Sequence, residues 1–138
     1  MASWSDSTIR EFHAKAGKGI AGFGDRLLLL TTVGARSGKE RISPVMYHRD
    51  GERFVVVASK AGAPDNPAWY HNLKANPVAR VEVGAETGTE TFQVRAHEAK
   101  GEERERMYAD RVAIAPGFGE YQRNTSRRIP VMILERIG

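Results

Sequence analysis

"LLLLTTVGARSGKERISPVMYHRDGERFVVV", residues 27–57, holds three strand-like segments separated by two short turns. Residues 26–33, 41–49 and 53–60 are rich in apolar and β-branched side chains, which is typical of strands. Asp50-Gly51 is a hairpin turn signal between the second and third segments. Short connections of this kind join antiparallel neighbours, since parallel strands need long crossovers. The stretch therefore predicts a run of antiparallel strands.

Three further strands are expected downstream. Residues 78–84 and 89–98 alternate apolar and polar side chains, with Phe92, Val94 and Ala96 on the inward side of the second segment. Residues 128–137 form the last strand. Six strands with apolar alternation and few free edges indicate a small closed barrel.

Helices are expected between and before these strands. Ser5 or Asp6 can cap a first helix, and residues 1–20 form an N-terminal helix and loop. Asn66 and Pro67 suit the start of a short helix that ends at Asn76-Pro77. Residues 101–115 form a charged helix with Tyr108, Val112 and Ala115 as its buried stripe, and residues 116–127 form a loop or short helical turn.

The fold class is therefore mainly β with helices, an α+β fold. We expect a barrel of about six antiparallel strands with outer helices. The length of 138 residues indicates one domain, residues 1–138.

Composition excludes several classes of site. The chain has no cysteine, so disulfide frameworks, thiolate zinc sites and cysteine nucleophiles are ruled out, which is consistent with a cytoplasmic protein. The net charge of +4 fits either an ordinary solvated surface or an anionic ligand. Acidic residues interrupt nearly every basic run, so no nucleic-acid partner is expected. The N-terminus does not resemble a signal peptide.

The turn between the first two strands concentrates positive charge. Arg36 and Lys39 flank Ser37-Gly38, and Arg41 opens the next strand. Backbone N–H groups that point outward together, beside cations, form an anion-binding nest. The alternative is an ordinary polar hairpin turn, because glycine and basic residues are common there.

A second candidate site lies in residues 59–77. Lys60 follows a strand end, Ala61-Gly62 is small, and a helix begins soon afterwards, so this segment can cradle a ligand. Trp69 is either a core residue or the wall of a ring pocket.

Residues typical of metal or acid–base catalysis are not arranged for it. The histidines at 13, 48, 71 and 97 lack metal-ligand spacing, so no metal is expected, and no nucleophile–base pair stands out. His13 falls on the apolar stripe of the first helix, where packing is the commoner role. This shortage is informative if a bound cofactor carries the chemistry.

Three motifs occur in a fixed order: T-x-x-G-x-x-S-G from Thr31, S-K-x-G from Ser59, and N-P-x-W-Y-x-N-L-x-A-N-P from Asn66. Together, and over most of the chain from Leu27 onward, they resemble the deazaflavin-dependent nitroreductase family. That family belongs to the flavin and deazaflavin oxidoreductases with an FMN-binding-like split β-barrel. The resemblance implies coenzyme F420, a deazaflavin with a phosphate and a polyglutamate tail, as cofactor.

The resemblance also assigns roles by position. The positions that hold the anionic tail are Arg36, Ser37, Lys39 and Arg41. Those that line the phosphate and ring region are Ser59, Lys60 and Gly62, and those that border the deazaflavin are Pro44, Met46 and Trp69.

The substrate side departs from the family pattern. The best-known members carry tyrosines along the substrate lid, where this chain has Ala115, Phe118 and Tyr121, and a strand tyrosine, where it has Met46. The pocket, formed by these four residues, should be more open and more apolar. This disfavours nitroimidazole prodrugs and favours quinones and flat enones, such as unsaturated lactones or coumarin-like rings. Tyr121, a backbone N–H or a water would polarise the acceptor carbonyl.

The expected function is thus that of a reductase that uses reduced F420 on an activated C=C or a quinone. Two alternatives stay open: a deazaflavin or flavin carrier without fast turnover, and an FMN-dependent split-barrel oxidoreductase. The expected partner is a small hydrophobic or quinone-like molecule, and a homodimer is considered because split barrels often pair. The first helix, with Trp4, Ile9 and Phe12, is a candidate for peripheral contact with the inner membrane face.

Overall fold

The computed structural model describes residues 4–138. The strands are β1 (Leu27–Val33), β2 (Glu40–Asp50), β3 (Arg53–Val57), β4 (Val78–Gly84), β5 (Thr89–Glu98) and β6 (Val131–Arg136). The helices are α1 (Trp4–Lys15), α2 (Ala68–Ala75), α3 (Gly101–Ile114) and α4 (Gly117–Arg123), with a 3-10 turn, η1 (Lys60–Gly62).

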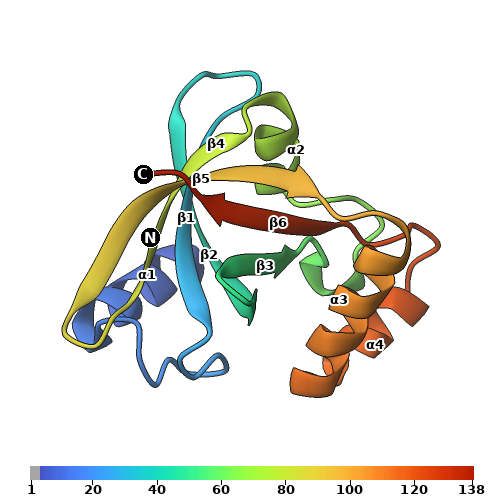
Figure 1. Cartoon of the computed structure of the whole chain (residues 1–138), viewed down its shortest axis with the longest axis horizontal. Coiled ribbons are helices and arrows are strands. Elements are labelled where there is room, and N and C mark those ends of the chain that lie inside the picture. The colour runs from blue at the N-terminus through green and yellow to red at the C-terminus, as the bar shows by residue number, and fades with distance from the viewer. Residues whose placement is uncertain (1–3) are drawn as a thin grey trace.

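The strands form one closed antiparallel barrel in the order β1-β2-β3-β6-β5-β4 (Figure 1). Strand β1 closes it by pairing with β2 on one side and β4 on the other, so that Leu29 lies opposite both Pro44 and Glu82. The predicted α+β fold with a six-stranded antiparallel barrel and outer helices is confirmed.

Strand β1 is apolar throughout its first half because both of its faces are covered. Leu28 and Leu30 point into the barrel interior, whereas Leu27 and Leu29 pack outside against Phe12 of α1. Burial of apolar surface on both sides stabilises the strand by roughly 25 cal/mol for each Å² removed from water.

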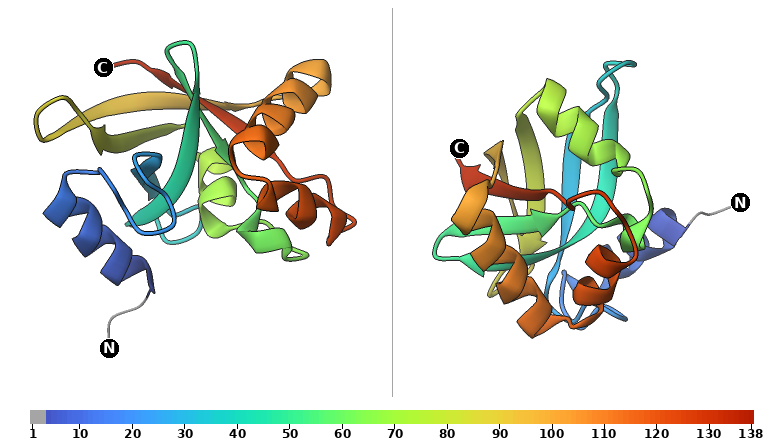
Figure 2. Two further views of the ribbon diagram at one scale, coloured as in Figure 1. Left: turned by 90° about the horizontal axis from the view of Figure 1, so that it is seen from below. Right: turned by 90° about the vertical axis from the view of Figure 1, so that its right-hand side faces the viewer.

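Strand β6 follows the same rule on the opposite side of the barrel. Val131 and Ile133 pack outward against Met107 and Tyr108 of α3. Figure 2 shows α3 and α4 side by side against this part of the barrel, well away from α1. Helix α2 contributes Trp69 and Leu73 to the barrel interior.

Several boundaries differ from the sequence predictions. Ser5 and Asp6 lie inside α1 and do not cap it, and Asn66 is displaced as cap because Pro67 immediately precedes α2. The third strand ends at Val57, since the chain turns into η1. The last strand begins at Val131, and the segment predicted as a loop or short turn contains a two-turn helix, α4.

The buried stripe of α3 was also predicted incompletely. Its buried residues are Arg104, Met107, Tyr108 and Arg111, whereas Val112 is only half-buried and Ala115 lies beyond the helix. Two arginines therefore occupy positions that apolar periodicity does not find.

In α1, His13 is exposed and lies 3.2 Å from Glu82, so the expectation that it packs inward is wrong. The side chain of Trp4 lies outside the described residues. Among residues 4–138, no helix is long and apolar enough to cross a membrane.

Candidate functional site

An apolar cavity of about 490 Å³ opens between the barrel and α4. Most of the predicted ring and substrate residues line it: Pro44, Met46, Ser59, Lys60, Trp69, Ala115, Phe118 and Tyr121. They come from β2, from η1 and the residue before it, and from the helical segments after Pro67 and after α3. The structure thus brings together residues up to 77 positions apart in the chain, as Pro44 and Tyr121 illustrate.

A second, cationic cavity of about 750 Å³ lies between the β1–β2 turn and α2. Arg36, Ser37 and Arg41 line it from the turn, and His71 and Asn72 line it from the helix. Trp69 belongs to the walls of both cavities, although it is itself 8% exposed. The two predictions for Trp69, core residue and pocket wall, are therefore both correct.

Several backbone N–H groups of the turn are already used within the chain. The N–H of Gly34 donates to Lys39 O at 2.8 Å, and that of Gly38 donates to Gly34 O at 3.0 Å. The Lys39 N–H donates to Ser37 Oγ at 3.2 Å. These three groups cannot also bind an anion, so a nest at this turn would be limited to the remaining N–H groups, beside the side-chain cations.

Asn72 of α2 fixes the turn against the helix. Its Oδ1 accepts a hydrogen bond from the Ala35 N–H at 3.0 Å, and its Nδ2 donates to Thr32 Oγ1 at 3.0 Å. Asn72 is buried, so both bonds are shielded from water. The third motif of the sequence, which contains Asn72, thus positions the first.

The cations of the turn are exposed and unpaired. Within residues 4–138, Arg36, Lys39 and Arg41 form no ion pair with a carboxylate, and the neighbouring Glu40 lies instead 3.4 Å from Arg80. Charges that are not neutralised by the chain remain available to an anionic ligand.

The backbone after β3 adopts an unusual conformation. Lys60, Ala61 and Gly62 all have positive φ angles, of 46°, 54° and 81°. For residues with a side chain, the left-handed region costs roughly 1–2 kcal/mol each. Such conformations persist where the surrounding structure holds them, and they cluster at ligand sites.

Arg127 holds this segment in place. Its guanidinium donates to the carbonyl oxygens of Ser59 at 2.7 Å, Ala63 at 2.9 Å and Ala58 at 3.2 Å, and to Asn66 Oδ1 at 2.7 Å. The planar five-donor fork of arginine suits this set of acceptors. The sequence does not predict that Arg127 would hold residues 58–63, because this arginine lies in an irregular segment before β6.

Close packing against α4 leaves no space for a side chain at Gly62. A Cβ atom at Gly62 would lie 3.0 Å from Tyr121 O and 3.2 Å from Tyr121 Cα. The close approach brings η1 against α4, so Gly62 shapes the apolar cavity without lining it. Lys39 is likewise outside both linings, and Lys60 is in the apolar cavity with its Nζ 2.9 Å from Asp65 Oδ2.

Helix α4 forms one wall of the apolar cavity. The Tyr108 hydroxyl donates to Phe118 O at 2.6 Å and anchors the helix to α3. The Phe118 and Tyr121 rings meet edge to face with centroids 5.1 Å apart. With Ala115 beside them, this wall is mostly apolar and has one hydroxyl.

Arg111, which the sequence analysis missed, also lines the apolar cavity. It is fully buried, and its Nε donates to His48 Nδ1 at 2.9 Å. Its Nη2 donates to Val55 O at 2.8 Å and to Met46 O at 3.3 Å. Burial lowers the pKa of Arg111 to about 10, so the guanidinium stays charged at neutral pH.

The site offers a flat apolar space joined to a cationic groove. Such a pair of cavities can hold a ligand that has a planar ring at one end and an anionic chain at the other.

Comparisons with known proteins agree with this geometry. Residues 3–136 match the family model of the F420H(2)-dependent quinone reductases. The chain is 38% identical over 137 residues to an F420H(2)-dependent quinone reductase of Mycobacterium tuberculosis strain H37Rv, which covers 95% of this chain and 87% of that protein.

Two solved structures are also similar. One, described as an F420-H2 dependent reductase (FDR-A), has 41% identity and a TM-score of 0.71 over 80% of this chain and 94% of its own. The other, described as a domain-swapped dimer, has 38% identity and a TM-score of 0.74 over 94% of each chain.

Proposed function

Since the chain belongs to the F420H(2)-dependent quinone reductase family, we propose that it is an oxidoreductase that passes a hydride from reduced coenzyme F420 to a quinone. The finer part of the proposal adds other flat activated acceptors: enones, unsaturated lactones and coumarin-like rings. The observation that carries the proposal is the position of Trp69 in both cavity walls, which joins an apolar space to a cationic one.

The residues present fit this cofactor. Pro44, Met46 and Trp69 supply apolar walls for the flat deazaflavin. Arg36 and Arg41 line the adjoining cavity with positive charge that no carboxylate of residues 4–138 neutralises, which suits a phosphate and a glutamate tail. A hydrogen bond to a charged group contributes roughly 1.5–3 kcal/mol, so a few such contacts account for strong binding.

F420 would supply the hydride, and the residues of the chain would position the cofactor and the acceptor. The apolar walls exclude water and hold the donor ring against the acceptor, which must approach to about 3–3.5 Å for the transfer. Tyr121, the one hydroxyl of the α4 wall, is proposed as the donor of a hydrogen bond to the acceptor carbonyl. The tyrosine-poor wall leaves room for a bicyclic quinone.

The direct test mixes the protein with reduced F420 and menadione and follows the return of deazaflavin absorbance. Oxidation well above the protein-free rate is expected. Binding of F420 without such oxidation would favour a carrier, and purification with bound FMN and no affinity for F420 would favour a flavin enzyme. Reduction of a coumarin under the same conditions tests the wider acceptor range.

A homodimer is part of the proposal, supported by the similar structure described as a domain-swapped dimer. The expected result of light scattering after size exclusion is twice the 15.3 kDa mass of the chain. A mass equal to that of one chain at micromolar concentration would remove the dimer from the proposal.

The proposed location is the cytoplasm, with peripheral membrane contact through α1 as a separate element. Phe12 is fully buried against the barrel and Ile9 packs beside it, so neither supports such contact. Co-sedimentation of the intact protein with vesicles, lost on deletion of residues 1–16, would support contact. No binding by the intact protein would end this element.

A further inference from the structure

The apolar cavity contains a buried positive charge that the proposed hydride transfer does not yet use. Arg111 contributes to the cavity wall while its residue is 0% exposed. The Phe118 ring, which lines the same cavity, lies 4.8 Å from Arg111 Cζ. A charge in such a setting acts on the cavity contents through few intervening atoms and little water, so its field is weakly screened.

No carboxylate of residues 4–138 pairs with Arg111. Its three acceptors are His48 Nδ1 and the carbonyl oxygens of Met46 and Val55, and none is a carboxylate. A buried charge is normally paired, because an unpaired one is costly to bury. Three hydrogen bonds to neutral acceptors hold the guanidinium but leave its charge uncompensated.

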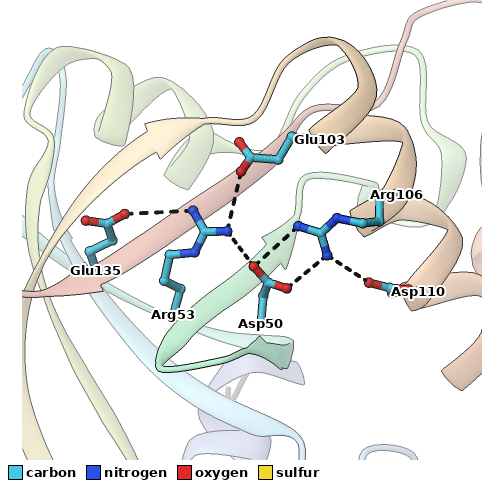
Figure 3. A network of polar contacts seen from close by, with 6 residues as sticks. All are labelled: Asp50, Arg53, Glu103, Arg106, Asp110 and Glu135. Atoms are coloured by element: carbon cyan, nitrogen blue, oxygen red, sulfur yellow. Dashed lines mark hydrogen bonds and ion pairs between the residues drawn. The ribbon is translucent and has the colours of Figure 1, made fainter.

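Asp50 and Asp110, the two acidic groups that act on the neighbouring His48, are already paired with other arginines (Figure 3). Asp50 accepts hydrogen bonds from Arg53 and from Arg106, the latter at 2.9 Å. Asp110 lies 3.5 Å from the same Arg106. Tyr108, the remaining polar neighbour, is a neutral phenol whose burial raises its pKa, and the exposed Arg26 adds positive charge.

His48 cannot supply the missing negative charge. Its Nδ1 accepts a hydrogen bond from Arg111, so the proton of the neutral ring lies on Nε2. Burial first, and then the charge of Arg111, lower the pKa of His48 to about 4. Its Nε2 is buried with no hydrogen-bond partner. The ring therefore orients Arg111 as a neutral acceptor.

We propose that Arg111 is the resident positive charge of the apolar cavity and that it selects acceptors whose reduced form is an oxyanion. The proposal rests on the proposed function, since it concerns the acceptor of that hydride. It deepens that function because it names the charge that would stabilise the oxygen of the reduced acceptor: the hydroquinone oxyanion from a quinone, or the enolate oxygen from an enone or lactone.

The quinone gains a hydride, that is two electrons and one hydrogen nucleus: the donor C–H bond breaks, the donor is oxidised, and an O–H bond forms at one quinone oxygen. The displaced electron pair of the quinone comes to rest on the other carbonyl oxygen, and the product is a hydroquinone monoanion. A solvent proton neutralises that oxygen later. Preorganised positive charge is most effective where negative charge develops during the reaction.

The test uses a flat phenol that titrates near neutral pH, 4-nitrophenol, with no F420 present, so that His48 stays neutral throughout the titration. The absorbance of the bound probe is followed against pH, because its phenolate and neutral forms differ in colour. The full-length wild-type protein is expected to lower the pKa of the bound probe by about one unit, a tenfold preference for the anion. Arg111→Met should abolish this shift, and Arg111→Lys should retain part of it.

Two controls separate the buried charge from other causes. Arg26→Met removes an exposed arginine that acts on the same region and should leave the shift nearly intact. In the wild type, raising the salt to about 1 M should preserve the shift, because a buried charge is screened little. This second control needs no variant and holds even if Arg111→Met fails to fold.

Three outcomes would overturn the proposal: no binding of the probe to the wild type, the same shift in Arg111→Met, or disappearance of the shift in salt. If the probe shift is present but reduced F420 is not oxidised with menadione, the proposed function fails while the charge of the cavity stands. The two failures are therefore distinguishable.

Discussion

The two cavities are both lined by arginine that no carboxylate of residues 4–138 neutralises, but in opposite surroundings. Arg36 and Arg41 stand in water on the β1–β2 turn, whereas Arg111 is fully buried beside His48. Water and salt weaken the exposed charges, and many partners can compete for them. The guanidinium of Arg111 is held in one orientation by its hydrogen bonds, and salt screens its charge little.

This difference suggests a division of labour. Exposed cations suit the capture of a flexible anionic tail, because they attract from a distance and adapt to it. A buried, oriented cation suits a reaction in which charge develops at one place. In the proposed function the turn would determine cofactor affinity, and Arg111 would determine the rate with quinones.

The largest expected effect is on the buried side of this comparison. Arg111→Met should lower kcat for menadione by about 10²-fold, the usual cost of removing one preorganised group that stabilises an oxyanion. The affinity for F420 should change little, and Arg111→Lys should recover part of kcat. Steady-state kinetics with both substrates varied provide the measurement.

Arg26→Met is the matched control for that variant, since it removes an exposed arginine of the same region. A fall in kcat of equal size in both variants would contradict a specific role of Arg111 in the reaction. An effect of Arg111→Met that appears only as a higher KM for F420 would contradict it as well.

A second expected effect concerns His48, which accepts a hydrogen bond from Arg111. The pKa of His48 is lowered by burial from 6.5 to about 4, so the unfolded chain binds this proton more readily than the folded one. Its contribution to stability is complete above about pH 6.5 and is lost as the pH falls toward 4. Protonation would also place a second cation beside Arg111.

The measurement is the free energy of unfolding in urea at pH 7 and pH 5, for the wild type and His48→Gln. The wild type should lose more stability on acidification than the variant. Asp50 stays ionised across this window, because hydrogen bonds from Arg106 and Arg53 lower its pKa to about 2. Equal losses in the two proteins would show that His48 does not titrate in this way.

A smaller effect is expected on the exposed side. Arg36→Ala combined with Arg41→Ala should weaken F420 binding by about tenfold at low salt, if each exposed contact contributes up to about 1 kcal/mol. In about 1 M salt the difference should nearly vanish, because exposed attractions are screened. Fluorescence titration of F420 gives the dissociation constants of the wild type and of the double variant at each salt concentration.

The control for the turn is Arg95→Ala, an exposed arginine of β5 outside both cavity linings. It should bind F420 as the wild type does at every salt concentration. A double variant of the turn whose defect persists unchanged in high salt would mean that the turn acts by shape and not by charge.

The sequence was sufficient for the barrel and for the exposed side of the site. Alternation of apolar residues and short turns predict antiparallel strands, and the cations of the turn are adjacent in the chain. Which N–H groups the turn consumes could not be predicted, because those of Gly34 and Lys39 depend on the exact backbone path.

The buried side could not be predicted in the same way. Arg111 lies on a helix with many charged residues, where an arginine is normally solvated, and its acceptors Met46, His48 and Val55 come from two distant strands. Arg127 is similar, since three of its four acceptors are backbone oxygens, which any sequence would offer. Both roles arise from tertiary packing. His48 lies on the outer face of β2, beside Val55 and under α3, where a polar residue is ordinary, so it carried no signal either.

The most direct measurement of the central claim compares F420 with the same deazaflavin lacking its phosphate and glutamate tail. Calorimetry would give the dissociation constants of both ligands for the wild type and for the Arg36→Ala, Arg41→Ala variant at low salt. The account predicts that the wild type binds the complete cofactor more tightly and that the variant loses most of this preference. Equal weakening of both ligands, or no preference in the wild type, would contradict it.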